Sequence, residues 1–375
     1  MKNKIFKYDF LIVGAGLIGS LAAIALHQKK YQVLVIEKNK QFPKDERTLA
    51  VNANSRDFLR NLGIWKYLKS NFEPIDKIVI KDYVNKEDLI FHNTEESMGS
   101  VIFNKSLLKI SREYLTKNKI LLTNIDFHSF NFSPKKIFSI NSRRCFFNKI
   151  IFSLGKNYEN QENLKKNTFD IGHKAYVGFF KHQKKHNQTA YEIFTPSGPL
   201  AVLPSPSRQK KSSTFIFSTK NKMNFSELAD IIKSNFYSSH GNINMRSSIS
   251  YYPIKPHLSR PTQKDILLIG DTAHSIHPVA GQGWNLGIKD IQALCSCLDI
   301  YNIDETNFDD YYFSKRIIEN FTYLTFTNTL NHLYENQKPI TKPITKSIIK
   351  VSHFVLSNFP YLKNLFIKQA MGKIS

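Results

Sequence analysis

The sequence contains few cysteines and no long apolar run. The three cysteines, Cys145, Cys295 and Cys297, are too few for a disulfide framework, and the Cys-x-Cys pair has no partner pair for a zinc site. No apolar stretch reaches the ~20 residues that cross a bilayer as a helix. No internal repeat is visible. We therefore expect a cytoplasmic protein of about two closely joined domains.

Acidic residues are scarce as well. Lysine and arginine number 53 against 30 aspartates and glutamates, which gives a formal net charge of +23. The basic residues are scattered and form no helix with a nucleic-acid-reading motif, so we expect no nucleic-acid partner. Two explanations remain: solvated, lysine-rich faces, or contact with an anionic membrane surface.

The C-terminal segment shows the charge imbalance most clearly. Residues 336–375 contain no Asp or Glu, and seven lysines alternate there with apolar side chains. This composition is typical of a segment that lies in a membrane interface. An ordinary amphipathic helix that packs on the core has the same pattern, and the two explanations are compatible. We expect the protein to lie at the inner face of the membrane as a peripheral protein.

The N-terminus superficially mimics a signal peptide, because lysines precede an apolar run from Phe10 to Leu26. Asp9 interrupts the entry to that run. The run itself resolves into a strand (10–13), a Gly14-Ala-Gly16-Leu-Ile-Gly19 turn and a helix (17–28), followed by a strand (32–36) that ends at Glu37. This spacing is typical of dinucleotide binding, with the pyrophosphate on the helix N-terminus and the carboxylate on a ribose.

A second motif lies about 250 residues further along, from Asp271 to Gly287. The apolar run 265–269 predicts a buried strand, after which Asp271 is placed to accept hydrogen bonds from a ribitol or ribose hydroxyl. Glycines at 281, 283 and 287 let main-chain N–H groups approach a flat ring and open a helix whose dipole favours negative charge. The two motifs together indicate a flavoprotein.

Four segments carry a resemblance to a known family. They are residues 9–37, the Asp45-Glu-Arg47-Thr-Leu-Ala-Val string with 62–65, the string from Ala190 to Pro204, and residues 270–290. On these segments the chain resembles the FAD-dependent aromatic hydroxylases, and within them the ubiquinone-biosynthesis (polyprenylphenol) hydroxylases. The likeness is near full length apart from roughly residues 66–165.

The resemblance implies three groups of site residues. The first group is the loop beside the flavin ring, where catalysis takes place: Pro278, Gly281, Gln282 and Gly283. No side-chain nucleophile or base is assigned. The cofactor-binding residues are Gly14, Gly16, Gly19, Glu37, Lys38, Arg47, Gly270, Asp271, Gly281, Gly283 and Asn285. The substrate pocket takes Glu192, Phe194, Pro196, Gly198 and Pro199.

Two neighbouring features of the motifs limit these assignments. His274 and His277 have His-x-x-His spacing, but they lie between a strand-terminal Asp and a glycine loop and not on one helical face, so we expect no metal site. Tyr191 and Glu192 alternate along a strand, so their side chains point to opposite faces and only one of them lines the pocket.

The function implied by the resemblance is hydroxylation of the aromatic ring of a polyprenylphenol in ubiquinone biosynthesis. The cofactor is FAD, with NADPH or NADH as electron donor and a flavin C4a-hydroperoxide as the hydroxylating species. The implied partners are a polyprenylphenol-type substrate, other ubiquinone-biosynthesis enzymes and the membrane surface. Two alternatives remain: a flavin monooxygenase acting on a soluble aromatic compound, and a catalytically weakened FAD-binding subunit of a quinone-biosynthesis assembly.

The implied fold is α/β, with a Rossmann-like FAD-binding domain, an interleaved β-sheet substrate domain and a helical C-terminus. We expect the FAD-binding domain in three parts (1–75, 99–165 and 256–300), substrate-domain segments at 76–98 and 166–255, and a helical region at 301–375. Within the second part, strands near 119–123, 127–132 and 136–140 predict a small antiparallel layer. Pro339, Pro343 and Pro360 are expected to break the C-terminal helices.

One departure from the family pattern concerns the end of the strand that begins at about Phe147. Members of the family carry Ala-Asp-Gly there, followed by Ser and Arg. That Asp and that Arg are associated with both FAD and the pyridine nucleotide. This chain reads Phe-Ser-Leu154-Gly-Lys-Asn instead. We expect FAD binding to survive through residues 14–37 and Asp271, and the use of NAD(P)H to be less efficient.

Overall fold

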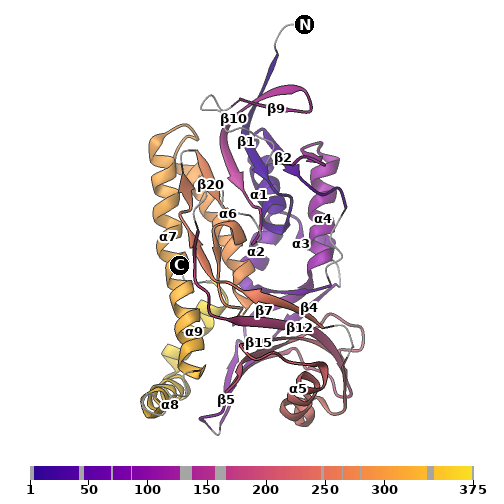
Figure 1. The fold of residues 1–375 in the computed structure, drawn as a ribbon, viewed down its shortest axis with the longest axis vertical. Helices are drawn as coiled ribbons and strands as arrows, with labels where there is room; N and C mark the ends of the chain where they lie inside the picture. Colours follow the sequence, from indigo (N-terminus) through magenta and orange to yellow (C-terminus); the bar gives the residue numbers. More distant parts are fainter. Residues whose placement is uncertain are drawn as a thin grey trace.

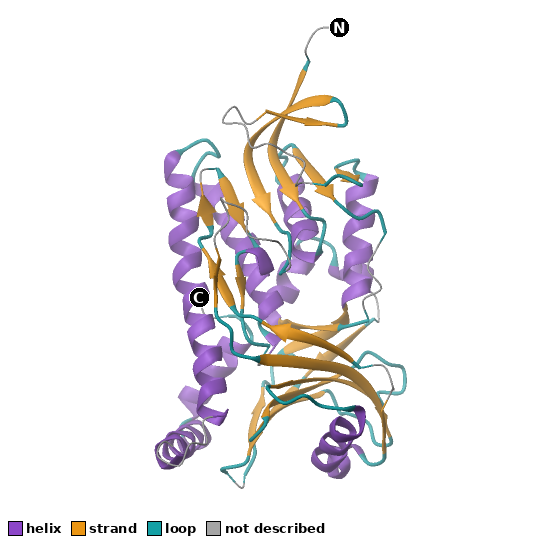
Figure 2. Ribbon diagram, viewed as in Figure 1, coloured by secondary structure: helices purple, strands orange, loops and turns teal. Residues whose placement is uncertain are grey.

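The structure is a computed structural model that describes residues 4–41, 46–68, 71–85, 87–126, 137–156, 166–245, 249–263, 265–278, 281–335 and 342–373. It has an α/β region above a second, strongly curved sheet (Figure 1). Figure 2 shows helices standing along the upper sheet and long strands crossing beneath them. The expected mixed α/β fold is confirmed.

Parallel strands form the centre of the upper sheet. β20 (Ile266–Leu268), β10 (Arg143–Phe152), β1 (Ile5–Val13), β2 (Val33–Glu37) and β8 (Leu121–Thr123) pair in that order, each parallel to its neighbour. Two antiparallel strands extend it, β19 (Thr262–Gln263) beside β20 and β9 (Ile137–Ile140) beside β10. Apolar runs such as 10–13 are buried because both faces of a parallel sheet are covered.

Helices α1 (Leu17–Gln28), α4 (Asn104–Lys117) and α6 (Gly283–Ile300) cover one face of this sheet and share its largest apolar core. On the opposite face, side chains of β1, β2 and β10, including Phe147, pack with Phe138 of β9. α1 is buried from Ile18 to Leu26, which explains why its sequence is almost entirely apolar.

The lower sheet has the order β16 (Ile243–Met245), β12 (His173–His182), β15 (Ser212–Thr219), β14 (Gly198–Pro204), β13 (Thr189–Thr195), β5 (Lys77–Asp82) and β6 (Leu89–His92), with β17 (Ser250–Ile254) also beside β12. α5 (Phe225–His240) covers its outer face (Figure 1). α5 begins with a capping box in which Asn224 and Glu227 bond each other's main-chain N–H groups.

Smaller elements connect the two regions. β3 (Thr48–Asn52), β7 (Gly99–Phe103) and β4 (Phe72–Ile75) form one sheet, and β11 (Lys166–Thr168), β18 (His257–Ser259) and β21 (His274–Ser275) form another. α2 (Ala53–Asn61), α3 (Trp65–Leu68) and the 3-10 turn η2 (Gly270–Thr272) complete the connections.

Three helices end the chain: α7 (Thr306–Glu335), α8 (Lys342–Asn358) and α9 (Pro360–Ala370). α7 runs along much of the length of the molecule, and α8 and α9 lie at its lower end (Figure 1). Pro360 begins α9 as expected, but the prediction for Pro343 is wrong, because it lies in the first turn of α8 where proline is tolerated. Pro339 lies outside the described residues. No helix in the described part of the chain is long and apolar enough to cross a bilayer.

The predicted antiparallel layer around residues 119–140 is also wrong in part. β8 joins the parallel sheet beside β2, because the helix α4 returns the chain as a parallel crossover. Only β9 pairs antiparallel, with β10. The strand expected near 127–132 lies outside the described residues.

Candidate active site

The glycine-rich turn after β1 lies against the end of β10. Gly14 has φ +103°, and a Cβ there would lie 2.3 Å from the main-chain oxygen of Ser153. At Gly19 a Cβ would lie 2.1 Å from the oxygen of Gly14. Both glycines are therefore required by the close approach of the chain to itself.

Gly16 is different. Its backbone, at φ −68° and ψ −173°, suits any residue, and a Cβ there would meet no protein atom within 4 Å. Gly16 is also the N-cap of α1, where main-chain N–H groups favour an anion. Nothing in the chain itself requires glycine here, so the open space fits a pyrophosphate that approaches the backbone closely.

Glu37 ends β2 beside this turn, and its side chain is only 12% exposed. Its carboxylate accepts the main-chain N–H of Ala15 at 2.7 Å and that of Asn39 at 3.0 Å. The predicted ribose-binding carboxylate thus lies at the carboxyl end of the sheet, where ligands of this fold bind.

Arg112 of α4 completes the turn, and sequence reasoning missed it. Its Nε donates to the oxygen of Ala15 at 2.8 Å, and its Nη2 lies 3.2 Å from Glu37 Oε2. The available signal was an arginine on the buried face of a helix, among Leu108, Ser111 and Leu115. A buried arginine is rare unless it has a partner.

The second motif lies next to the first. Gly270 follows β20 at φ +60°, and a Cβ there would lie 3.2 Å from Ile18 of α1. At Gly287 a Cβ would lie 2.8 Å from Ile18 and 3.3 Å from Gly270 Cα. Asp271 occupies the turn η2 and is partly exposed. The two distant motifs are therefore neighbours at one edge of the sheet.

A buried ionic cluster between α6 and α7 holds the turn of this second motif in place. Asp290 of α6 accepts the Gly270 N–H at 2.7 Å, His274 Nε2 lies 2.8 Å away, and Arg316 Nε of α7 donates to it at 2.7 Å. Arg316 also donates to Asn320 Oδ1 at 2.8 Å and pairs with Glu319. Sequence reasoning assigned no role to Asp290, although it ends the resemblance segment 270–290, and it missed Arg316, which no motif marks.

The flavin-ring loop leads into α6. Gly281 has φ +61°, donates its N–H to the oxygen of Pro278 at 3.1 Å, and lies close to Ala50 of β3. That hydrogen bond removes Gly281 from the predicted donors to the ring. Gln282 is the N-cap of α6 and Gly283 its first residue, and the first turn of a helix leaves N–H groups without an intrahelical partner. Ala280 lies outside the described residues.

Asn285 fixes this loop to β3. Its Oδ1 accepts the Asn52 N–H at 3.0 Å, and its Nδ2 donates to the oxygens of Ala50 at 2.9 Å and Gly281 at 3.2 Å. The structure therefore gives this side chain a part in positioning the loop.

Two predicted cofactor residues contact other parts of the protein. The guanidinium of Arg47 lies over the ring of Tyr252 at 5.2 Å, and Lys38 Nζ lies 3.0 Å from Asp126. Their contact with the cofactor stays a prediction. Asp45, which belongs to the same string, lies outside the described residues.

The two sides of β13 have different neighbours. Tyr191 packs edge to face on Phe236 of α5 at 5.2 Å, and burial raises its pKa. On the opposite side, Ala190 packs with Ile75 and Val101 of the small sheet that contains β3. Glu192, 8% exposed, alternates with Tyr191 and so faces the flavin-loop side.

The remaining predicted pocket residues are spread along the β13–β14 hairpin. Phe194 is buried and stacks on Tyr334 of α7 with ring centroids 3.9 Å apart. Gly198 has φ +129° and its Cβ would lie 2.0 Å from Ser218 O; Pro199 is buried beside it, whereas Pro196 is exposed at the turn. Phe194 and Pro196 are thus not brought together.

The histidines of the second motif belong to the core. His274 bonds Asp290, and His277 Nε2 lies 3.3 Å from His173 Nδ1.

Leu154 lies at the edge of the same site, because its N–H donates to Thr272 Oγ1 at 2.6 Å. The departure from the family pattern at Leu154 therefore lies directly beside the Gly270–Thr272 turn.

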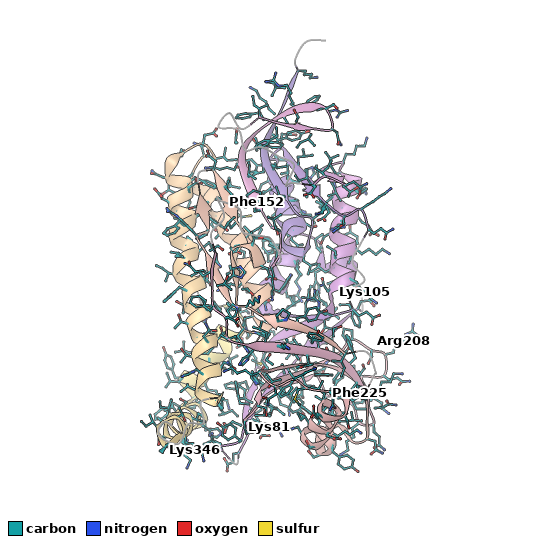
Figure 3. The ribbon with its side chains drawn as sticks, viewed as in Figure 1. Lys81, Lys105, Phe152, Arg208, Phe225 and Lys346 are labelled. Atoms are coloured by element: carbon teal, nitrogen blue, oxygen red, sulfur yellow. The ribbon has the colours of Figure 1, made fainter. Side chains whose placement is uncertain are left out.

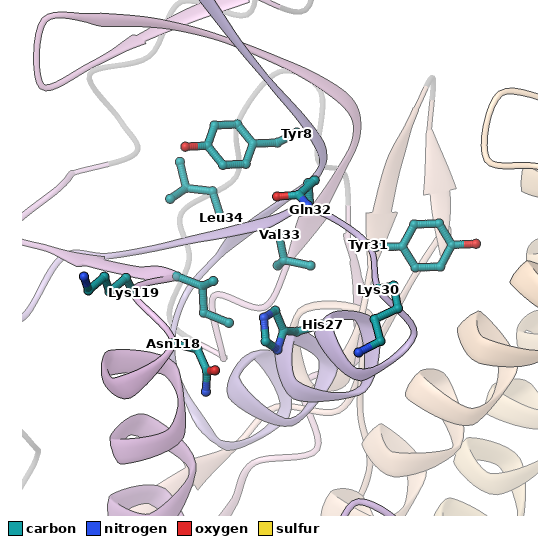
Figure 4. Close-up of a pocket in the computed structure, with 10 residues that line it drawn as sticks. Tyr8, His27, Lys30, Tyr31, Gln32, Val33, Leu34, Asn118 and Lys119 are labelled. Atoms are coloured by element: carbon teal, nitrogen blue, oxygen red, sulfur yellow. The ribbon is translucent and has the colours of Figure 1, made fainter.

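A cavity of about 340 Å³ lies elsewhere, at the amino-terminal ends of β2 and β8 (Figure 4). It is lined by His27, Gln32 and Lys119, among others. The adjoining helices α1 and α4 present their C-termini to it, and ligands of such sheets bind at the opposite edge. We assign it no part in the flavin site.

Comparison with known proteins identifies the family. Residues 7–110 and 153–303, more than half of the chain, match the family described as FAD binding domain. The chain belongs to this family. Its match begins before the glycine-rich turn and ends after α6, so both motifs described above lie within it.

Curated relatives narrow the family. The chain is 24% identical to the ubiquinone hydroxylase UbiM of Neisseria meningitidis, over 97% of this chain and 84% of the relative. It is also 24% identical to UbiL of Rhodospirillum rubrum (98% and 90%) and to the 3-demethoxyubiquinol 3-hydroxylase of Escherichia coli (77% and 79%). The protein is thus an FAD-dependent monooxygenase of the aromatic-hydroxylase type.

Solved structures agree on the fold. The p-nitrophenol 4-monooxygenase PnpA of Pseudomonas putida superposes with a TM-score of 0.77 at 13% identity, over 98% of this chain and 99% of that one. CtdE, solved in complex with FAD and a substrate, gives 0.68 at 15% identity, over 94% and 100%.

Proposed function

We propose that this monooxygenase hydroxylates the ring of a polyprenylphenol intermediate in ubiquinone biosynthesis, with NADPH or NADH as electron donor. The observation that carries the proposal is the near full-length similarity to ubiquinone hydroxylases, which extends over the substrate sheet and the C-terminal helices. The string from Ala190 to Pro204, which resembles this branch, forms β13 and β14 of that sheet.

Bound FAD would supply the redox chemistry, with NAD(P)H as the two-electron donor, O₂ as the source of the oxygen atom added to the ring, and water formed from the second oxygen atom. The chain's own residues bind and orient. Gly16 and the start of α1 admit the pyrophosphate, and Glu37 and Asp271 accept hydrogen bonds from hydroxyl groups. The start of α6, at Gln282 and Gly283, supports negative charge on the flavin.

The segment that contains α9 contacts both the start of α2 and α7. Met371, the C-cap of α9, accepts a 3.0 Å hydrogen bond from the main-chain N–H of Asn54 in α2. Gln369 donates to the Tyr323 hydroxyl of α7 at 3.2 Å. We infer that this segment helps to exclude water from the site, which would limit wasteful loss of reducing equivalents.

The substrate side is mainly apolar. Phe194, Tyr334 and Ile349 form one buried cluster, with Ile80 and Leu330 packed against it. Apolar side chains of this kind suit a prenyl tail. Glu192 is a polar group on the same face of β13. The proposal therefore places the ring toward Glu192 and the tail toward Phe194.

The test is conversion by the purified, FAD-loaded protein. NADPH, ¹⁸O₂ and a short-chain polyprenylphenol should give a product that has gained one labelled oxygen atom. Reduction of the flavin under anaerobic conditions should be faster when the phenol is present. Absence of labelled product with both NADPH and NADH would overturn the proposal.

Leu154 favours one second candidate, a catalytically weakened FAD-binding subunit of a quinone-biosynthesis assembly. Its position beside Thr272 removes a charge from the place that the family associates with the pyridine nucleotide. FAD that stays oxidised with either donor, in a protein that still binds FAD, would favour this candidate. Turnover of small phenols in preference to polyprenylphenols would instead favour a hydroxylase of soluble aromatics.

A further inference from the structure

α8 presents an apolar face that the fold does not cover. Its buried side chains Thr345 and Ile349 face the protein. Ile344, Ile348 and Val351 recur at helical spacing on another side, and Val351 is 61% exposed. Surface helices normally expose polar residues here, so this face is suited to an apolar environment.

α9 also exposes apolar side chains. Ile367 faces the protein, whereas Tyr361, Leu362 and Leu365 are exposed, Tyr361 to 74%. α8 and α9 follow each other directly and lie together at the lower end of α7 (Figure 1). The two sets of side chains, with Phe354 of α8, are called the C-terminal face: Ile344, Ile348, Val351, Phe354, Tyr361, Leu362 and Leu365.

The charged side chains on α8 and α9 are all basic. Lys350 and Lys368 are exposed beside it, Lys346 projects from the same helix (Figure 3), and residues 336–375 contain no acid. Acids on adjacent segments have partners: Asp88 lies 3.2 Å from Lys81, and Glu96 pairs with Arg56 and Lys373. Glu87 is an exposed acid on an adjacent segment, and its main-chain oxygen accepts a hydrogen bond from His353 of α8.

The positive charge distinguishes between two possible partners of the C-terminal face, a second copy of the chain and a lipid surface. Pairing two copies through the face would bring lysines against lysines, which like-charge repulsion disfavours. An anionic lipid surface attracts the lysines and also buries the apolar side chains at the depth of the lipid headgroups. We propose that the C-terminal face docks on an anionic bilayer.

The inner side of the same helix explains how docking would serve the enzyme. Ile349 of α8 packs with Phe194 and Tyr334, which form the apolar end of the proposed substrate region. Docking therefore places that region next to the lipid in which a prenylated phenol dissolves. This consequence rests on the proposed function, whereas the binding itself does not.

The test uses the full-length protein and vesicles in a flotation assay. The wild-type protein should bind phosphatidylcholine vesicles that contain phosphatidylglycerol, and bind them less at high salt. Ile348→Asp/Val351→Asp should lower the partition coefficient at least about tenfold per side chain, from the lost apolar burial. Lys350→Gln/Lys368→Gln should lower it roughly 25-fold, since each lysine near the surface contributes about a fivefold factor.

Matched variants control for net charge. Tyr67→Asp/Ile300→Asp places the same charges at exposed apolar positions of α3 and α6, and Lys117→Gln/Lys222→Gln removes two exposed lysines elsewhere. Both should bind as the wild type does. Absence of wild-type binding, equal losses in test and control variants, or a wild-type dimer that Ile348→Asp/Val351→Asp dissociates would each overturn the proposal.

Activity separates this proposal from the proposed function. The Ile348→Asp/Val351→Asp variant should keep wild-type turnover of a water-soluble short-chain phenol and lose turnover of a long-chain phenol in vesicles. If no phenol is turned over but flotation follows the pattern above, the docking surface stands and the proposed function fails.

Discussion

Asp290 and Gly270 are joined by a 2.7 Å hydrogen bond from the glycine N–H to the carboxylate, which ties α6 to the turn after β20. Burial alone would raise the pKa of Asp290, but His274 and Arg316 together lower it below its ordinary value. The carboxylate is therefore charged near neutral pH and holds the turn that contains Asp271.

Asp290→Asn tests this support. The variant keeps the size of the side chain and leaves the buried Arg316 with one counter-charge fewer, so unfolding should need about 3–5 kcal/mol less free energy. FAD content after purification should also fall. Urea unfolding and flavin absorbance measure the two effects. Asp310→Asn, at an exposed position of α7, should change neither; a stable, flavin-loaded Asp290→Asn protein would show that the bond is dispensable.

Gly14→Ala and Gly16→Ala should fail for different reasons. Gly14→Ala forces a Cβ to 2.3 Å from Ser153 O and should destabilise the apoprotein. Gly16→Ala meets no protein atom, so the apoprotein should keep its stability within ~0.5 kcal/mol. Its FAD affinity should nevertheless fall by on the order of tenfold or more, from about 1.4 kcal/mol of lost contact.

Denaturation of the apoprotein and fluorescence titration with FAD separate the two glycines. Normal FAD affinity in Gly16→Ala would argue against a pyrophosphate at this turn. Unchanged stability in Gly14→Ala would mean that β10 moves away more easily than its packing suggests.

Acid should destabilise the lower sheet through buried histidines. Burial, with His182 and Lys210, lowers the pKa of His186 to about 4, and burial, with His182 and His186, lowers that of His240 to about 3. Above pH ~6.5 neither state takes up these protons, so the histidines leave stability unchanged. Below it the unfolded chain binds protons that the folded one excludes, so stability falls until pH approaches the folded values.

Within that window, the free energy of unfolding should fall by about 1.4 kcal/mol for each histidine as the pH drops by one unit. Urea unfolding at pH 7.5 and 5.5 measures it. His240→Phe, which fits beside Phe180 and Phe236, should remove one histidine's share. His92→Phe, at an exposed position, serves as the control; identical slopes in wild type and His240→Phe would contradict the prediction.

Leu154→Asp should restore the charge that the family places beside the flavin turn. We expect faster reduction of the flavin by NADPH, because the family pattern associates a carboxylate at this position with the pyridine nucleotide, and residue 154 lies beside the Gly270–Thr272 turn. Stopped-flow absorbance under anaerobic conditions gives the rate. Leu154→Asn controls for polarity alone, and a wild-type rate that neither variant exceeds would mean that the position does not limit electron transfer.

The sequence determined the local part of this protein. α1 begins and ends where the glycine turn and the apolar pattern predict, at Leu17 and Gln28, and α6 opens at Gly283 as expected. These features follow from chain spacing, since a strand, a glycine turn and a helix are fixed by neighbours in sequence. The alternation of Tyr191 and Glu192 was readable for the same reason.

Only the tertiary structure decided which distant residues meet. Arg112 bonds Ala15, Asp290 bonds Gly270, and Phe194 stacks on Tyr334, and no sequence period relates the members of these pairs. Tertiary packing also put β8 in the parallel sheet and turned Arg47 onto Tyr252. The physical reason is that burial of charge and of aromatic surface depends on what the whole fold brings together, whereas helices and turns depend on adjacent residues.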